Sequence, residues 1–245
     1  LTTLERNLTP LPSSLTPTGT TVTNCIIRND VAASYGVYIM NARHTFIDSC
    51  DVEGDLRCIA VNNYSNDTKI SNCILKDSTN TSGTGILITQ YSYNVSIDTC
   101  TFNGSFGGNR AIYVQYGASA LISSCTFNDV GSNAIQINMM GKAHISDCIF
   151  NFGSIRTGRA IYLQGIDPAV ATAGNSMVVA TTLIPTTVIQ GCYFGDNSFE
   201  DVKIDSMFSY DTLQDISNEA LVFNNNIIHN VSTKQIISIN DGATI

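Results

Sequence analysis

Seven carboxylates and a single lysine fall in the 24 residues from Asp196 to Glu219. Two carboxylates that converge on a sugar can hydrolyse a glycosidic bond, whereas a polysaccharide lyase needs a base and a cation that stabilises the enolate. Asp201 and Asp205 are therefore weak candidates for catalytic residues. A run of carboxylates more often forms a solvated acidic face, and we favour that interpretation for residues 196–219.

A second acidic cluster offers the hard oxygen ligands that Ca²⁺ prefers, at Asp51, Glu53 and Asp55. A solvated turn is the more common origin of alternating carboxylates, so we favour that interpretation. The eight cysteines include no Cys-x-x-Cys pair, and no paired histidine motif accompanies them. We therefore predict neither a metal site nor a cofactor.

Seven of the eight cysteines recur at one position of a sequence repeat. Each has an aliphatic residue three positions before it and an apolar residue two positions after it, and successive members are 25, 23, 27, 25, 23 and 44 residues apart. The members are Cys25, Cys50, Cys73, Cys100, Cys125, Cys148 and Cys192, and Asn226 takes the same place in an eighth copy. The repeat length indicates a solenoid. The histidines His44, His144 and His229 occupy different places in the repeat, which favours turn or edge residues over a shared base.

A second apolar phrase follows each cysteine by about a dozen residues, as in GVYIM, GILIT and AIYLQ. Its inner residues alternate with polar or aromatic ones, which is the period of a half-buried strand. The outward positions carry tyrosines and amides and suit either sugar stacking or packing on another subunit, although β-propensity alone also places tyrosine on strands. The residues concerned are Tyr38, Tyr113, Gln115, Gln136, Tyr162 and Gln164.

Together these phrases resemble the right-handed parallel β-helix family, which includes pectate lyases and many phage tailspikes. The resemblance covers residues 21 to about 240. It implies an all-β fold, a single-stranded right-handed parallel β-helix of about eight to nine coils with the cysteines in an inward row. The chain then divides into an arm or linker at 1–20, rich in Ser, Thr and Pro, and a β-helix domain at 21–245. The catalytic phrases of the polygalacturonase-like and pectate-lyase-like branches are missing, which favours a non-enzymatic protein over a polysaccharide lyase or glycoside hydrolase.

Stacked coils would bring neighbouring cysteines of the row to a Cα separation of about 4.8 Å, which a disulfide tolerates. The sterically feasible pairs are Cys25/Cys50, Cys73/Cys100 and Cys125/Cys148. We favour instead small buried thiols that fill a tight corner of each coil. Cys58 lies off the row, where other repeats have glycine or alanine.

Seven Asn-x-Ser/Thr sequons are candidate sites of N-linked glycosylation. They are Asn7, Asn63, Asn66, Asn80, Asn94, Asn103 and Asn230. In a eukaryotic protein their position in predicted turns and strand edges favours an extracellular glycoprotein. In a phage or bacterial protein the same residues are ordinary turn asparagines.

The net charge of −8 predicts no attraction to nucleic acid or to an anionic membrane. No apolar run reaches the roughly 18 residues of a membrane-spanning helix. The remaining partners are other copies of the chain, in a homo-oligomer or filament, and glycans. The sequence thus predicts a structural subunit of an extracellular, cell-surface or virion-surface fibre, with residues 1–20 docking on a neighbouring chain. The alternative is a domain that binds or degrades polysaccharide.

Overall fold

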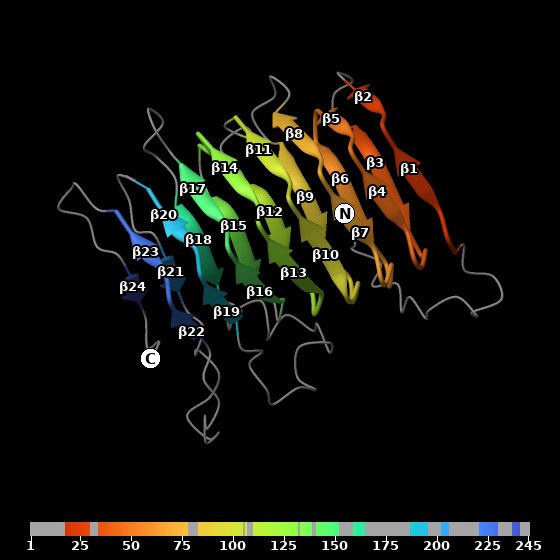
Figure 1. Ribbon diagram of the computed structural model, residues 1–245. Coiled ribbons are helices and arrows are strands. Elements are labelled where there is room, and N and C mark those ends of the chain that lie inside the picture. The colour runs from red at the N-terminus through yellow and green to blue at the C-terminus, as the bar shows by residue number, and fades with distance from the viewer. Residues whose placement is uncertain are drawn as a thin grey trace, which may run out of the picture.

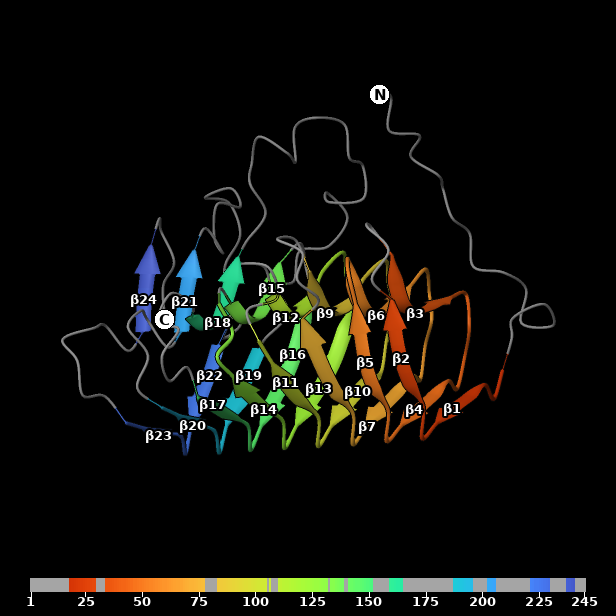
Figure 2. The same cartoon turned by 90° about the horizontal axis from the view of Figure 1, so that it is seen from above.

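The chain winds into a parallel β-solenoid with three sheets, and successive strands along the sequence enter successive sheets. The computed structural model describes residues 18–29, 34–77, 83–104, 106, 110–131, 133–138, 141–151, 159–164, 187–195, 202–205, 221–229 and 237–240. Within these ranges each sheet has eight strands, and every named pairing is parallel to its neighbour from an adjacent coil. Figure 1 shows the strands stacked from red to blue, and Figure 2 shows the coils from above. The predicted all-β parallel helix is confirmed.

Sheet 1 begins each coil. Its strands are β1 (Thr21–Thr23), β4 (Phe46–Asp48), β7 (Lys69–Ser71), β10 (Val95–Asp98), β13 (Ser119–Ser123), β16 (Lys142–Ser146), β19 (Thr187–Gln190) and β22 (Leu221–Asn224). Sheet 2 follows, with β2 (Ile26–Asn29), β5 (Asp51–Gly54), β8 (Ile74–Asp77), β11 (Thr101–Asn103), β14 (Thr126–Asn128), β17 (Ile149–Asn151), β20 (Tyr193–Phe194) and β23 (Ile227–Ile228).

Sheet 3 completes each coil. Its strands are β3 (Tyr35–Met40), β6 (Arg57–Asn62), β9 (Thr84–Ile88), β12 (Arg110–Val114), β15 (Asn133–Asn138), β18 (Arg159–Gln164), β21 (Val202–Asp205) and β24 (Ile237–Asn240). Because one coil cannot bury its own apolar side chains, the core forms only when coils stack and like residues meet.

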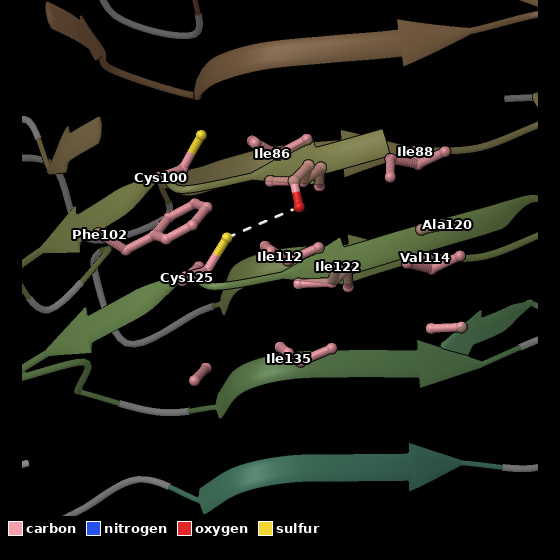
Figure 3. Close-up of a cluster of buried hydrophobic side chains, with 14 of the residues drawn as sticks. Ile86, Ile88, Cys100, Phe102, Ile112, Val114, Ala120, Ile122, Cys125 and Ile135 are labelled. Carbon is pink, nitrogen blue, oxygen red and sulfur yellow. Dashed lines mark hydrogen bonds between the residues drawn. The ribbon is translucent and has the colours of Figure 1, made fainter. Parts of the chain in front are cut away.

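The core consists of rows of like residues that run along the solenoid. In sheet 1, Ile97 is in register with Ile70 on one side and Ile122 on the other, and all three are buried. In sheet 2, four phenylalanine rings stack with centroids 4.8 to 5.0 Å apart; these are Phe102, Phe127, Phe150 and Phe194. In Figure 3 the labelled side chains of neighbouring strands point into the space that the coil encloses.

One residue in the left-handed region turns the chain from sheet 1 to sheet 2 in every coil. It lies between the end of the sheet 1 strand and the ladder cysteine, or Asn226 in the last coil, and its φ is between 51° and 64°. The residues are Asn24, Ser49, Asn72, Thr99, Ser124, Asp147, Gly191 and Asn225. In the first seven coils the backbone N–H of this residue donates to a carbonyl of the next coil, as from Asn72 to Asp98 at 3.1 Å. Asparagine and aspartate tolerate this conformation better than other non-glycine residues, which explains the polar composition of the turn.

The ladder cysteines all occupy the position after this turn. Each thiol donates to the carbonyl two residues before it, at 3.1 to 3.4 Å. Cys25 in the first coil is partly exposed, and the other six are buried. Figure 3 marks a second, longer bond of 3.7 Å from Cys125 to the carbonyl of Ile97 in the preceding coil. Cys58 is also buried, and its thiol donates to the carbonyl of Lys76.

Asn226 continues the row with an amide in place of the thiol. Its Oδ1 accepts from the backbone N–H of Cys192 at 2.9 Å, and its Nδ2 donates to the carbonyl of Ile189 at 3.1 Å. The longer side chain thus reaches back to the preceding coil and satisfies one donor and one acceptor there. Such a residue fits the last coil, where the core is not covered by a further described coil.

Because they are shielded from solvent, the buried thiols are expected to be free and unreactive in the folded protein, including Cys192, whose pKa is lowered by a hydrogen bond from Cys148. Hydrogen bonding to Cys125 and burial raise the pKa of Cys100 to about 12. At pH 7 this leaves a thiolate fraction on the order of 10⁻⁵, and the thiolate is the reactive form. Native labelling with a maleimide at pH 7 should therefore modify Cys25 first, and labelling in denaturant should count eight thiols. Fewer than two thiols in denaturant would instead show that the row is crosslinked.

Candidate interaction face on the third sheet

The predicted tyrosines and amides gather on the outer surface of sheet 3. Tyr113 is in register with Gln136, and Gln136 with Tyr162, while Gln164 lies in the next outward row, in register with Asn138. Tyr38 begins the same tyrosine row on β3, and Gln115 directly follows β12. We call these six residues the tyrosine–amide face. Five of the six residues lie within strands of sheet 3, and Gln115 lies one residue beyond β12; their role as an interface or sugar-binding face stays a prediction.

A row of arginines lies beside this face. It was not predicted from the sequence. Arg57 and Arg110 each pair with Thr84 between them, and Asn133 then separates Arg110 from Arg159. Each arginine opens its strand, one position before the small buried residue at the start of the apolar phrase. The sequence interpretation took the phrase to begin at that small residue, so it left the preceding arginine out of the face. We call Arg57, Arg110 and Arg159 the arginine strip.

Every arginine of the strip lies over a tyrosine ring. The guanidinium carbon of Arg110 is 4.2 Å from the ring centroid of Tyr113, and that of Arg159 is 5.5 Å from Tyr162. Arg57 lies 5.3 Å from the Tyr35 ring and donates from Nη1 to the Tyr35 hydroxyl at 2.8 Å. Stacking on an aromatic face holds the planar guanidinium in a defined orientation.

Amide side chains connect the middle of the face. Gln136 is 2% exposed; its Oε1 accepts from Arg110 Nε and from Asn133 Nδ2, and its Nε2 donates to Gln164 Oε1 at 2.9 Å. Asn138 Nδ2 donates to the Tyr113 hydroxyl at 2.6 Å. Burial raises the pKa of Tyr113, so this hydroxyl stays protonated at neutral pH. Hydrogen bonds between neighbours fix these side chains before any partner binds.

Two acceptors on this surface have no hydrogen-bond partner among the described residues. They are Oδ1 of Asn133 and Oδ1 of Asn138, in residues that are each 7% exposed. Burying an acceptor without a partner costs about 1 to 3 kcal/mol. The groups gathered here, which are guanidinium, phenol and amide, are suited to bind a partner by contact and hydrogen bonding.

The structure does not describe the side chains of the candidate catalytic residues, Asp201 and Asp205, so it does not place them as a pair on this face. Asp205 ends β21, and its backbone is in register with Gln164. Its side chain and the whole of Asp201 lie outside the described residues, so their predicted role stays a prediction.

The other acidic cluster is occupied by cations of the protein itself. Asp51 Oδ2 is 2.7 Å from Arg28 Nη2 and 2.9 Å from Lys76 Nζ, and Glu53 Oε2 is 3.2 Å from Arg28 Nε. Partial burial acts to raise the pKa of Asp51, but hydrogen bonds from Arg28 and Lys76 outweigh it and hold the pKa below its usual value. Throughout the part of the chain that the structure describes, no group of three or more His, Cys, Asp or Glu residues could hold a metal ion.

The described sequons differ in how far they present their asparagine. Asn63 is only 8% exposed, which leaves little room for a glycan without rearrangement. Asn66 and Asn103 are partly exposed and Asn94 is exposed, so these three present a side chain at the surface. Asn7, Asn80 and Asn230 lie outside the described residues. Glycosylation at any of the seven stays a prediction.

The chain belongs to the right-handed β-helix family, because the model of the right-handed β-helix region matches residues 13–108 and 84–245. Comparison with curated proteins and with solved structures gives no significant match to either. Among the described residues, no helix is both long and apolar enough to cross a membrane. The family match establishes the fold class and its handedness and leaves the activity to be argued from the surface.

Proposed function

We propose that this protein is a structural, non-enzymatic subunit of an extracellular or virion-surface fibre, and that its copies associate end to end. The proposal rests on the unpaired strand edges at the two described ends of the solenoid. β1, β2 and β3 lie at one end of the three sheets and β22, β23 and β24 at the other, and no described strand pairs with their outer edges.

The first coil leaves core side chains uncovered. Val22, Ile27 and Val37 point inward but are only partly buried, whereas their partners in the second coil, such as Ile47, are fully buried. Ile26, on the outer side of β2, is 76% exposed. Apolar surface at an open end favours a cover that the described coils do not provide.

The last described coil also leaves core side chains partly uncovered. Leu221, Phe223 and Ile228 are only partly buried against the core, and Ile227 is 65% exposed. The strands within each sheet run in one direction, so the last coil of one copy can stack on the first coil of another with the same parallel pairing found inside the chain. Such a head-to-tail contact does not close on itself, and it therefore produces a filament rather than a dimer.

A variant with charges at the open end tests this proposal. Replacing Ile27 and Val37 with lysine should leave single chains where the unmodified protein forms filaments, because lysine in the first coil blocks a neighbouring coil from stacking. Electron microscopy and sedimentation velocity measure the assemblies, and circular dichroism checks the fold. Leu121→Lys is the matched control, since Leu121 is 54% exposed on β13 in the middle of the solenoid. The proposal is wrong if the end variant assembles as the unmodified chain does, or if the unmodified chain stays monomeric.

The N-terminal arm is tested separately. Of its residues, Thr18 to Thr20 are described, and Thr18 bridges to Arg43 in the second coil. Deleting residues 1–20 should shorten or abolish the filaments and leave the circular dichroism spectrum of the β-helix intact.

Glycan binding is a second candidate, and the tyrosine–amide face favours it. Tyrosine rings with amide groups at their edges combine apolar area with hydrogen-bonding groups. If the full chain depolymerised a polysaccharide, with activity lost on Asp201→Asn or Asp205→Asn, this alternative would replace the fibre proposal.

A further inference from the structure

The arginine strip places positive charge at a regular interval along the solenoid. Its members alternate with Thr84 and Asn133, so they occupy every second coil. Coils stack at about 4.8 Å, so neighbouring guanidinium groups begin from backbone positions about 10 Å apart. The strip runs along the direction in which the coils stack, in the same sheet as the tyrosines.

The six strands of sheet 3 from β3 to β18 contain three arginines but neither aspartate nor glutamate. Among the described residues, Arg57 and Arg110 form no ion pair. The chain as a whole carries −8, so this face is positive on an acidic protein.

The same chain contains a segment of opposite charge. Residues 196–219 hold seven carboxylates and Lys203, a net charge of −6 out of −8 for the whole chain. Arginine pairs with carboxylates through two parallel hydrogen bonds, and a guanidinium already oriented on a ring loses less freedom on pairing. Complementary charge patches of this kind steer association and set which surfaces meet.

We propose that the arginine strip of one copy binds the acidic segment 196–219 of a second copy, so that β-helices associate side by side as well as end to end. The strip and its tyrosines supply the binding surface, and the acidic segment supplies the carboxylates. This lateral contact uses a different surface from the open ends and goes beyond the proposed end-to-end assembly. The two proposals can therefore fail separately.

Charge reversal in both partners provides the test, carried out on the full chain with Ile27→Lys and Val37→Lys to suppress end-to-end stacking. In this background, lateral association at low salt should weaken as NaCl is raised. Reversing the strip (Arg57→Glu, Arg110→Glu, Arg159→Glu) should raise the dissociation constant at least about tenfold. Reversing the acidic segment (Asp211→Lys, Asp215→Lys, Glu219→Lys) should do the same.

Mixing the two reversed proteins should restore association, because each then offers a surface complementary to one on the other. Sedimentation velocity of each protein alone and of the mixture reads out this recovery. If the strip reversal impairs folding by circular dichroism, the Gln variants of the three arginines replace it and should weaken self-association without a charge clash. Lys142→Glu is the control, because Lys142 is exposed on β16 of sheet 1, away from the strip.

Four results would overturn the proposal. The first is that mixing does not restore association, and the second is that the strip variants associate as strongly as their parent. The third is that reversal weakens binding to an anionic polysaccharide such as polygalacturonate while self-association is unchanged, which would make a glycan the occupant of the strip. Loss of thermal stability without any change in association would place the contact within one chain and would also overturn it.

Discussion

Replacing Phe127 with alanine is expected to lower the free energy of unfolding by about 3 to 5 kcal/mol. The ring is fully buried and lies between two others, 4.8 Å from Phe102 and 4.9 Å from Phe150, with interplanar angles of 10° and 6°. Its loss removes contacts on both faces and leaves a cavity in a row that backbone pairing holds at fixed spacing. The neighbouring coils cannot collapse into the gap without breaking their register.

Equilibrium urea denaturation followed by circular dichroism measures this change. Ile149→Ala is a suitable control, because Ile149 lies in the next coil of the same sheet but is 40% exposed, and its truncation should cost much less. Equal effects of the two substitutions would show that the phenylalanine row does not carry the core.

The second large effect is expected for Cys100→Asp. Cys100 is 1% exposed, and its thiol donates to carbonyl oxygens of Asp98 and Ile70. A carboxylate there has no cation to pair with and would face those carbonyl oxygens, so ionisation is strongly opposed. We expect a loss of several kcal/mol, or protonation of the aspartate with a somewhat smaller loss.

Cys100→Ala separates the effect of charge from that of volume. Alanine removes one sulfur and should cost clearly less than aspartate, and the gap between the two should narrow at low pH as the carboxyl group becomes protonated. Thermal and urea unfolding at pH 7 and pH 4 measure both quantities. A similar cost for the two variants at both pH values would mean that position 100 is accessible to water.

The solenoid could be predicted from the sequence because the residues that repeat are the buried ones. The interval from Ile97 through Cys100 to Phe102 crosses the corner between two sheets, and side chains that must meet their equivalents in the next coil leave little choice of residue. The tyrosines at 113 and 162 were placed for the same reason, by the two-residue period of a strand.

The arginine strip shows where this reasoning failed. Ala111 and Ile112, which follow Arg110, are both buried, so the alternation breaks there, and Arg110 lies over the ring of Tyr113 although the two are three residues apart. A strict alternation puts them on opposite faces. The roles of Asp201 and the sequons depend on loops whose length differs between coils, and residue periodicity carries no information about such segments.

The corner between sheets 1 and 2 has the same length in every coil, with one left-handed residue and one cysteine or asparagine between the two strands. The intervals of 23 to 44 residues between cysteines therefore arise elsewhere in the coil. This corner keeps a constant length in every coil. The rest of each coil can lengthen without disturbing the stacking of the strands. Gene duplication of a whole repeat would consequently add one coil and about 4.8 Å of length, whereas an insertion of a single residue at that corner would turn a core row outward.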